Sequence, residues 1–365
     1  MDNKFTNSRE RDVAQSTSVP GIKGRGSAEN PANRFEKIEL EPTAEEISEG
    51  ISPETVFYKD TTKSIITYND SPDVGFDAGI NPYRGCEHGC IYCYARPSHE
   101  YLGLSLGLDF ESRIFVKEDA PALLRKELSS PKYVPDTIVI SGNTDCYQPA
   151  ERRFRLTRAC LEVLYEFRNP AGIITKNHLV TRDIDVLKGF TEWDGVMVAV
   201  SITTLDPELK RVMEPRTSEP RLRLRAIEEL SENGIPVIVM VAPVIPGLTD
   251  HEIPNIIKSA SEAGARSAGF VMLRLPYGVS DLFTSWLGRH FPERKEKVLA
   301  RIRSMRGGKL NSPEFHDRMR GKGVFAEQAR ELFEVACRKA GFNGSRIELS
   351  TAHFRRPGGT QLDLF

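Results

Sequence analysis

The sequence lacks a long apolar run and a recognisable leader segment. No stretch of about eighteen consecutive apolar residues, the length needed to cross a bilayer as a helix, occurs among the 365 residues. The opening stretch, MDNKFTNSRERDVAQSTS, contains neither the apolar core of a signal peptide nor an Arg-rich amphipathic pattern. We therefore expect a cytoplasmic protein with no membrane partner.

Net charge and cysteine are also scarce. The chain has 50 Lys and Arg against 51 Asp and Glu, so its net charge of -1 does not indicate a uniformly basic nucleic-acid binder. A basic stretch between residues 289 and 322 either faces phosphates or is a solvated helix face. In a reducing compartment the six cysteines are expected to be metal ligands, reactive thiols or core residues rather than disulfides. Cys160 and Cys337 lie in helical patterns and are expected in the core.

The sequence does contain a repeated alternation of short apolar runs and amphipathic helical stretches. A first strand is predicted in GINPYRG, and further strands in DTIVISG, GIIT, GVMVAVS, PVIVMVAPV and SAGFVML. Strands that alternate with helices of this length are typical of βαβ units on a parallel sheet. About six units are fewer than the eight of a closed barrel. We predict an α/β fold, a partial (β/α)6 TIM-type barrel, with Gly234 and Gly264 in left-handed positions after two of its helices.

The predicted organisation has four parts. Residues 1–50 are polar and lack apolar periodicity, so we expect most of them to be disordered or laid over the surface. Residues 51–280 form the barrel, residues 281–350 a basic helical C-terminal region, and residues 351–365 a flexible tail. Polar residues gather just after the predicted strands, where parallel α/β proteins build their ligand sites.

The stretch GCEHGCIYCYARP places Cys86, Cys90 and Cys93 within eight residues. A structural zinc site with His88 or His99 as the fourth ligand is one interpretation, but such sites usually join ligand pairs from separated segments. The spacing also differs from the cysteine run of bacterial ferredoxins. A set that stops at three cysteines indicates that a fourth coordination position is kept for another molecule.

A C-x3-C-x2-C loop after the first strand of a partial barrel resembles the radical S-adenosylmethionine (SAM) superfamily. The resemblance implies that Cys86, Cys90 and Cys93 hold three irons of a [4Fe-4S] cluster, whose fourth iron binds SAM. It also implies an electron donor such as flavodoxin or ferredoxin. One electron then cleaves SAM to methionine and a 5′-deoxyadenosyl radical, which abstracts hydrogen from the substrate.

Between residues 78 and 250 the loops are similar to those of the spore photoproduct lyase branch, which repairs a thymine lesion in DNA. The similar stretches include CEHGCIYCYAR, ITK, VSITTLDPELKRVMEPRT and RLRLRAIEELSENGIPVIVMVAPVIP. The resemblance implies a set of SAM-binding side chains, each of which is otherwise a solvated loop residue or a core residue. These are Thr144 and Asp145 for the ammonium group, Lys176 and Ser201 for the carboxylate, and Val244 and Ile245 for the adenine.

The same resemblance suggests groups for hydrogen transfer. Tyr92 and Tyr94 flank the last cysteine and match tyrosines that help return hydrogen to the product radical, although both could simply pack around the cluster. Cys146 is the candidate hydrogen donor, but it follows the Thr-Asp pair, whereas the lyase cysteine precedes that pair. In EPRT, Glu214 or Arg216 either forms a structural ion pair or reaches the substrate.

The last five residues, QLDLF, resemble the pentapeptide by which bacterial polymerases and repair proteins bind the sliding clamp. In that interpretation Leu362, Leu364 and Phe365 enter a hydrophobic groove and Gln361 makes polar contacts at its rim. The alternative is a tail that packs on the protein or has no role.

Taken together, the resemblances predict a radical SAM enzyme that is lyase-like and acts on damaged DNA. One alternative is radical modification of RNA, a peptide or a small metabolite. Another is a DNA-associated iron-sulfur binding or sensing module without turnover.

Overall fold

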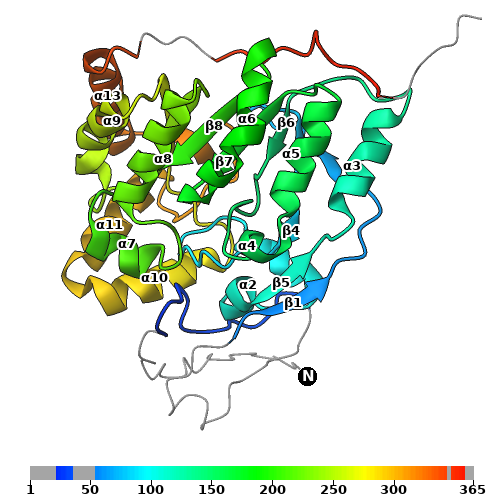
Figure 1. The fold of residues 1–365 in the computed structure, drawn as a ribbon. Coiled ribbons are helices and arrows are strands. Elements are labelled where there is room, and N and C mark those ends of the chain that lie inside the picture. Colours follow the sequence, from blue (N-terminus) through cyan, green and yellow to red (C-terminus); the bar gives the residue numbers. More distant parts are fainter. Residues whose placement is uncertain (1–21, 36–53, 343–346, 358–365) are drawn as a thin grey trace, which may run out of the picture.

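The computed structural model describes residues 22–35, 54–342 and 347–357 (Figure 1). Its main sheet has seven strands in the order β10-β9-β8-β7-β6-β3-β2. Neighbours from β3 to β10 pair in parallel, while β2 pairs antiparallel with β3. The six parallel strands confirm the predicted partial (β/α)6 barrel. The bounds are β2 Ile66–Tyr68, β3 Ala78–Ile80, β6 Ile138–Ile140, β7 Ala171–Thr175, β8 Val196–Ser201, β9 Val237–Val244 and β10 Ser267–Met272.

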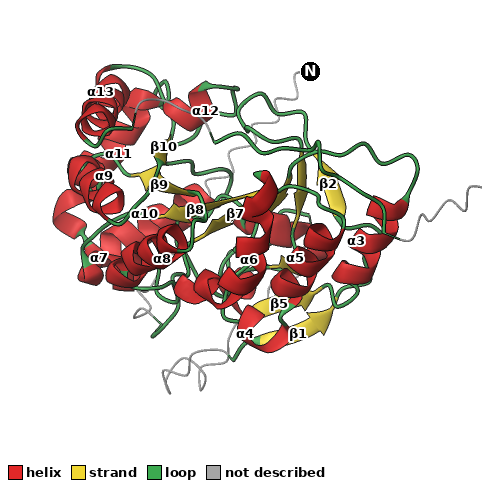
Figure 2. Ribbon diagram, turned by 45° about the horizontal axis from the view of Figure 1, so that its top comes forward, coloured by secondary structure: helices red, strands yellow, loops and turns green. Residues whose placement is uncertain are grey.

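Helices follow the parallel strands and pack on the outer face of the sheet (Figure 2). The apolar strand residues and the inner helix faces form one large buried core, because both faces of a parallel sheet are covered. Gly234 and Gly264 have φ angles of 76° and 98°, as predicted for residues that end helices. The helix bounds are α3 Ala120–Ser129, α5 Leu156–Glu166, α6 Ile184–Phe190, α8 Pro220–Glu232 and α9 Ile253–Glu262.

A second, three-stranded sheet departs from the expectation. Its order is β1-β5-β4, with bounds β1 Val56–Lys59, β4 Tyr83–Arg84 and β5 Arg113–Val116. The predicted first strand GINPYRG is therefore divided between the two sheets, because the chain leaves the barrel after Ile80 and pairs again at Tyr83. Two short helices, η1 Arg96–Leu102 and α2 Leu108–Ser112, lie between β4 and β5 in the chain, and a third, α4 Glu151–Phe154, follows β6.

The C-terminal region is helical, as predicted. Helix α13 packs against α9 and α11 and so adds a layer outside the barrel (Figure 1). Within the described residues no helix is both long and apolar enough to span a bilayer. The remaining bounds are η2 His178–Asp183, η3 Thr191–Trp193, α7 Pro207–Met213, η4 Asp250–Glu252, α10 Val279–His290, α11 Pro292–Met305, α12 Asp317–Arg320 and α13 Val324–Lys339.

Two segments outside the regular elements lie against the protein. In residues 22–35, here called the N-terminal strap, residues 25–28 are buried against the protein, and Asn30 Nδ2 donates to Asp109 Oδ1 at 3.1 Å. Near the C-terminus, Phe354 packs on the ring of Tyr133 with centroids 5.6 Å apart, so this part of the expected flexible tail is attached. Most of residues 1–50, and the QLDLF stretch, lie outside the described residues.

Candidate active site

The cysteine loop follows β4, shortly after the first barrel strand β3, and folds tightly at two glycines. Gly85 and Gly89 have φ angles of 80° and 66°, which favour glycine over residues with a Cβ. A Cβ at Gly89 would lie 2.7 Å from Glu111 Oε2, so glycine is also needed there for space. The main chain is fixed by hydrogen bonds from Cys86 N to Phe110 O at 2.9 Å and from Ile91 N to Met213 O at 3.1 Å.

A buried ion pair supports the loop from behind. Arg96 is fully buried, donates from Nε to Cys90 O at 3.0 Å, and pairs with Glu111 at 2.5 Å. Glu111 also accepts from the main-chain nitrogens of Gly26 at 3.0 Å and Ser27 at 2.8 Å. The strap, the loop and α2 are thus joined through one carboxylate, which holds the strap against the cysteines.

The three thiols fit the predicted cluster ligands by chemistry and burial. Cys86 and Cys90 are buried and Cys93 is partly buried, and all three are free thiols. Burial raises the pKa of Cys86, and Asp145, Cys90 and Cys93 raise it further, so the thiols lie within electrostatic reach of one another. Burial likewise raises the pKa of Cys90 and Cys93, so all three are neutral thiols, and they would need bound positive charge, which a metal centre supplies, to act as thiolate ligands. Among the described residues no three His, Cys, Asp or Glu side chains form a group that could hold a single metal ion.

The two histidines considered as zinc ligands have other partners. His99 is buried, and its Nε2 lies 2.9 Å from Arg113 O. Burial lowers the pKa of His99 to about 4, so this imidazole is neutral. His88 Nδ1 lies 3.3 Å from Asp145 Oδ2, and its Nε2 lies 3.2 Å from Asn177 Nδ2. His88 therefore links the cysteine loop to the loops after β6 and β7.

Asp145 is an acceptor for several chain segments. Its carboxylate accepts from Tyr147 N at 2.9 Å, Thr175 Oγ1 at 2.8 Å and Lys176 N at 2.7 Å, and it contacts His88. Burial alone would raise the pKa of Asp145, but His88 and the main-chain donors outweigh burial and the pKa is lowered. An incoming ammonium group would have to replace the long contact to His88.

Thr144, the other half of the predicted pair, is buried, and its Oγ1 donates to Tyr83 O at 3.0 Å. The preceding Ser141 has a φ of 91°, uncommon for a residue with a Cβ, and its Oγ donates to Thr144 O at 2.6 Å. The loop after β6 is thus held in one conformation beside the cysteine loop.

Lys176 and Glu214 form the centre of a buried charged network. Lys176 Nζ donates to Thr203 Oγ1 at 3.0 Å and to Ala242 O at 2.9 Å, and it pairs with Glu214 at 3.2 Å. Glu214 also pairs with the fully buried Arg223 at 2.5 Å. Burial acts to raise the pKa of Glu214, but the two cations outweigh it, so the pKa is lowered and the carboxylate is ionised. Glu214 thus forms the structural ion pair that was one of its two interpretations.

The other predicted SAM contacts lie at the carboxyl ends of the next strands. Ser201 ends β8, and Val244 ends β9 with Ile245 directly after it. Ser201 is 5% exposed, whereas Val244 and Ile245 are almost fully buried. The structure therefore gathers Lys176, Ser201 and the two apolar residues at one end of the barrel, although Val244 and Ile245 also belong to the core.

The three predicted hydrogen-transfer residues lie in different environments. Tyr92 is buried, and its hydroxyl donates to Glu214. Tyr94 is 45% exposed, donates to Gly142 O and stacks under Arg274 at 5.0 Å. Cys146 is fully buried in the core, where its Sγ donates to the carbonyls of β6 and β7 at 3.8 and 3.9 Å. This position disfavours direct contact between Cys146 and a substrate.

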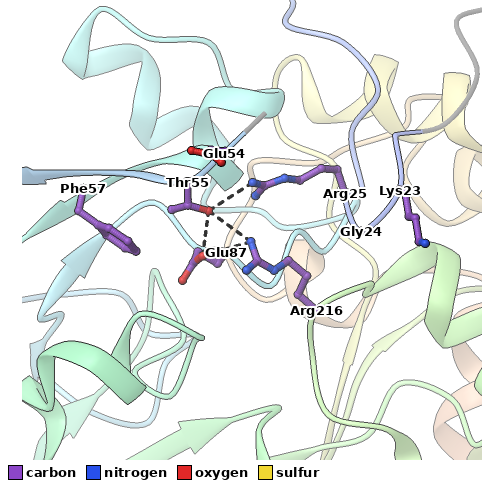
Figure 3. A pocket seen from close by; sticks show the side chains of 8 residues that line it. All are labelled: Lys23, Gly24, Arg25, Glu54, Thr55, Phe57, Glu87 and Arg216. Atoms are coloured by element: carbon purple, nitrogen blue, oxygen red, sulfur yellow. Dashed lines mark hydrogen bonds and ion pairs between the residues drawn. The ribbon is translucent and has the colours of Figure 1, made fainter. Parts of the chain in front are cut away.

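A pocket of about 490 Å³ lies next to the cysteine loop (Figure 3). Thr55 Oγ1 donates to Glu87 Oε1 at 2.9 Å and accepts from Arg25 at 3.2 Å and from Arg216 at 3.3 Å. Arg216 also pairs with Glu87 at 3.1 Å. Arg216 of EPRT is thus held in an ion pair beside Cys86. The lining residues are Lys23, Gly24, Arg25, Glu54, Thr55, Phe57, Glu87 and Arg216.

Several residues of the site have no clear signal in the sequence. Arg223 lies within an ordinary amphipathic helical pattern, and Thr203 is one of several polar residues after β8. Arg96 and Glu111 are fifteen positions apart and meet only in the folded chain. His88, placed between two cysteines, carried a signal, but as a zinc ligand rather than as a link to Asp145.

Comparison with known proteins assigns the class. The family model described as the radical SAM superfamily matches residues 80–260. An uncharacterized protein of Mycobacterium tuberculosis (strain ATCC 25618 / H37Rv) is 36% identical over 244 residues, which are 66% of this chain and 71% of the relative. One of Methanocaldococcus jannaschii is 34% identical over 173 residues, 47% of this chain and 62% of the relative. The chain belongs to the radical SAM superfamily, whose members are enzymes that use a [4Fe-4S] cluster and SAM.

The fold is similar to that of spore photoproduct lyase. One mutant of that lyase has a TM-score of 0.57 and 16% identity, with 82% of this chain and 83% of the lyase covered. Another, with bound AdoMet and dinucleoside spore photoproduct, has a TM-score of 0.58 and 15% identity, with 87% and 89% covered. At this identity the likeness establishes the fold.

Proposed function

We propose that this radical SAM enzyme acts on nucleic acid, with a lesion in DNA as its favoured substrate. The observation that carries the proposal is the three-thiol loop at the carboxyl end of the first parallel strand, linked by His88 to Asp145. In parallel α/β folds this end of the barrel builds the ligand site. The lyase-like loops and fold and the basic stretch between residues 289 and 322 favour a nucleic-acid substrate.

In this proposal Cys86, Cys90 and Cys93 hold the cluster as thiolates. When bound, the cluster and SAM supply a 5′-deoxyadenosyl radical that abstracts hydrogen from the substrate. The ammonium group of Lys176, together with the hydroxyl of Ser201, binds the SAM carboxylate through charge-assisted hydrogen bonds. The network around Lys176 fixes the position of its ammonium group before SAM arrives, which reduces the entropy lost on binding.

The remaining predicted contacts complete the SAM site. Val244 and Ile245 provide an apolar wall for the adenine and exclude water from it. Asp145 and Thr144 bind the SAM ammonium group, with His88 yielding its contact to the carboxylate. Tyr94, the more exposed of the two tyrosines, is the one that contacts the substrate.

The test is 5′-deoxyadenosine formation by anaerobically reconstituted, reduced protein. Undamaged duplex DNA, UV-irradiated duplex DNA, bulk tRNA and no substrate are compared. We expect irradiated DNA to stimulate turnover strongly and the other three conditions not to. Stimulation by tRNA alone would favour RNA modification. Turnover that no nucleic acid stimulates would remove DNA repair as the function and leave the radical SAM class intact.

A matched pair of cysteine variants controls this test. Cys90→Ala removes a proposed cluster ligand and is expected to abolish both iron incorporation and 5′-deoxyadenosine formation. Cys160→Ala changes a fully buried core thiol and is expected to keep both. A reconstituted wild-type protein that contains iron but forms no 5′-deoxyadenosine under any condition would instead support the sensing module.

Further partners are proposed from the sequence. The QLDLF tail is proposed to bind the sliding clamp. An electron donor such as flavodoxin or ferredoxin is proposed to reduce the cluster, and the protein is proposed to be cytoplasmic. A peptide ending in QLDLF is expected to bind purified clamp saturably, and a peptide with Leu362 and Phe365 changed to Ala is expected to bind much more weakly. Equal binding of the two peptides would contradict the clamp interpretation.

A further inference from the structure

Three arginines gather at the carboxyl end of β10, beside the cysteine loop. Arg274 follows β10, Arg306 directly follows α11 as its C-cap, and Arg318 lies in α12. The guanidinium carbon of Arg274 lies 5.0 Å from the ring centroid of Tyr94, which directly follows Cys93. All three arginines lie after residue 260, where the match to the superfamily model ends.

Arg274 has few partners for its donors. A guanidinium group carries five N–H donors, and here Nη1 contacts only Met319 Sδ at 3.3 Å, a weak acceptor. Its Nε is buried without a hydrogen-bond partner. Among the described residues no carboxylate forms an ion pair with Arg274. Burial lowers the pKa of Arg274, and the charge of Arg318 lowers it further.

Arg306 and Arg318 add positive charge that is only partly balanced. Arg306 is 5% exposed. Its Nη1 donates to Asp317 O and its Nη2 to Leu273 O at 2.8 Å, while its Nε has no partner. Arg318 pairs with Asp73 at 2.5 Å, and the imidazole of His316 lies 3.3 Å from the same carboxylate. Burial lowers the pKa of Arg306 to about 10, with Arg274 as the next cause. Two carboxylates, those of Asp73 and Asp317, therefore face three guanidinium groups, and the Nε donors of Arg274 and Arg306 are unused.

We propose that Arg274, supported by Arg306 and Arg318, is an anion subsite that binds a phosphodiester of the nucleic-acid substrate. This inference rests on the proposed function and specifies how that substrate is held. Guanidinium groups bind phosphate oxygens through paired, charge-assisted hydrogen bonds, which would satisfy the unused donors. The adjacent half-exposed Tyr94 offers a ring on which a base or sugar next to that phosphate can pack.

The SAM carboxylate is the other anion that could reach this end of the barrel. Lys176 already provides an ammonium group for it, and Lys176 lies after β7 whereas Arg274 lies after β10. A phosphodiester also agrees better with the basic stretch between residues 289 and 322, because a polyanion contacts several cations at once. Measuring the affinity of the same variants for an oligonucleotide and for SAM distinguishes a phosphodiester from the SAM carboxylate.

The experiment measures binding of an undamaged, fluorescein-labelled single-stranded oligonucleotide to the reconstituted holoenzyme by anisotropy at several salt concentrations. Arg274→Ala is expected to weaken binding about tenfold and to reduce the salt slope by about one. Arg274→Lys keeps the charge and is expected to bind at an intermediate level. Arg338→Ala, which removes an exposed arginine on α13, is expected to match the wild type. SAM affinity, measured by calorimetry, is expected to be the same in all four proteins.

Equal oligonucleotide affinity and equal salt slope in Arg274→Ala and Arg338→Ala would overturn the inference. A loss of SAM affinity in Arg274→Ala without a loss of oligonucleotide binding would overturn it in favour of the SAM carboxylate. A wild-type protein that shows no saturable binding of the oligonucleotide would also overturn it. The measurement needs no turnover. It therefore separates this inference from the proposed function, which depends on which substrate stimulates 5′-deoxyadenosine formation.

Discussion

Glu214 holds two cations, the buried Arg223 and the partly buried Lys176, at the carboxyl end of the barrel. Glu214→Gln keeps the shape of the side chain and removes its charge, so Arg223 stays buried without compensation. Breaking a buried pair in this way costs about 3–5 kcal/mol of folding free energy. We expect the urea midpoint of the variant to fall accordingly. Because the folded-state pKa of Glu214 is lowered, its ionised carboxylate contributes to folding stability at neutral pH, and this contribution is lost as the pH falls.

The matched control is Glu208→Gln. Glu208 is exposed on α7 and pairs with Arg211 at the surface, where such pairs contribute little. The control should shift the free energy of unfolding by no more than about 0.5 kcal/mol. Equal urea midpoints for the two variants would contradict the assignment of Glu214 as a structural centre. The assignment would also be contradicted if the difference in urea midpoint between Glu214→Gln and wild type grew as the pH is lowered.

Cys146 and Tyr94 were both predicted to serve hydrogen transfer, and their burial separates them. Because the thiol of Cys146 is fully buried between β6 and β7, Cys146→Ala should leave the product and the substrate-dependent turnover within about twofold of wild type. Tyr94→Phe removes a hydroxyl group at the half-exposed position and serves as the comparison. Mass spectrometry of the reaction products tests this prediction. A changed product from Cys146→Ala would restore the Cys146 thiol as the candidate hydrogen donor.

Among the elements, the N-terminal strap covers the cysteine loop at very close range. A Cβ on Gly26 would lie 1.7 Å from Gly89 O, so Gly26→Ala must lift the strap or displace the loop. We expect Cys86 and Cys90 of the metal-free protein to be alkylated several-fold faster in this variant, because local opening exposes them. Peptide mass spectrometry measures the rates. Gly75→Ala, where a Cβ meets nothing within 4 Å, should react like wild type, and equal rates in both variants would show that the strap does not protect the thiols.

The barrel could be predicted from the sequence because its signals are local. Each buried strand is a short apolar run, each helix has an amphipathic period, and Gly234 and Gly264 mark two helix ends. The cysteine loop could also be located, since its three ligands lie within eight residues. Where function depends on residues close in sequence, one chain is enough to propose a site.

What depends on distant pairing could not be predicted. The second sheet joins Val56–Lys59 to Arg113–Val116, which are separated by more than fifty residues, and no local period specifies that register. The strap has no apolar periodicity, and it is held by hydrogen bonds to Glu111, which lies 85 residues beyond Gly26. The Arg274 cluster likewise brings together three basic residues whose charge alone favours a solvated surface.

Considered as a whole molecule, the barrel has two ends with different uses. The cysteine loop, Lys176 and Arg274 follow the carboxyl ends of strands. Residues 350–356 attach instead at the amino ends, where Ser350 N donates to Asp194 O at 3.0 Å, just before β8. The chain therefore leaves the described structure on the side away from the site (Figure 1).

This arrangement predicts that the tail has an anchored part and a part that does not affect stability. Phe354 packs between Tyr133 and Phe167 with centroids 5.6 and 6.3 Å apart, so Phe354→Ala should cost about 1–2 kcal/mol and lower Tm by about 1–3 °C. Deletion of residues 358–365 should leave Tm unchanged and abolish clamp binding. Differential scanning calorimetry of the two proteins distinguishes the parts. If the deletion lowered Tm as much as Phe354→Ala, the QLDLF residues would be packing on the barrel, and a tail used for packing is not free to hold a partner.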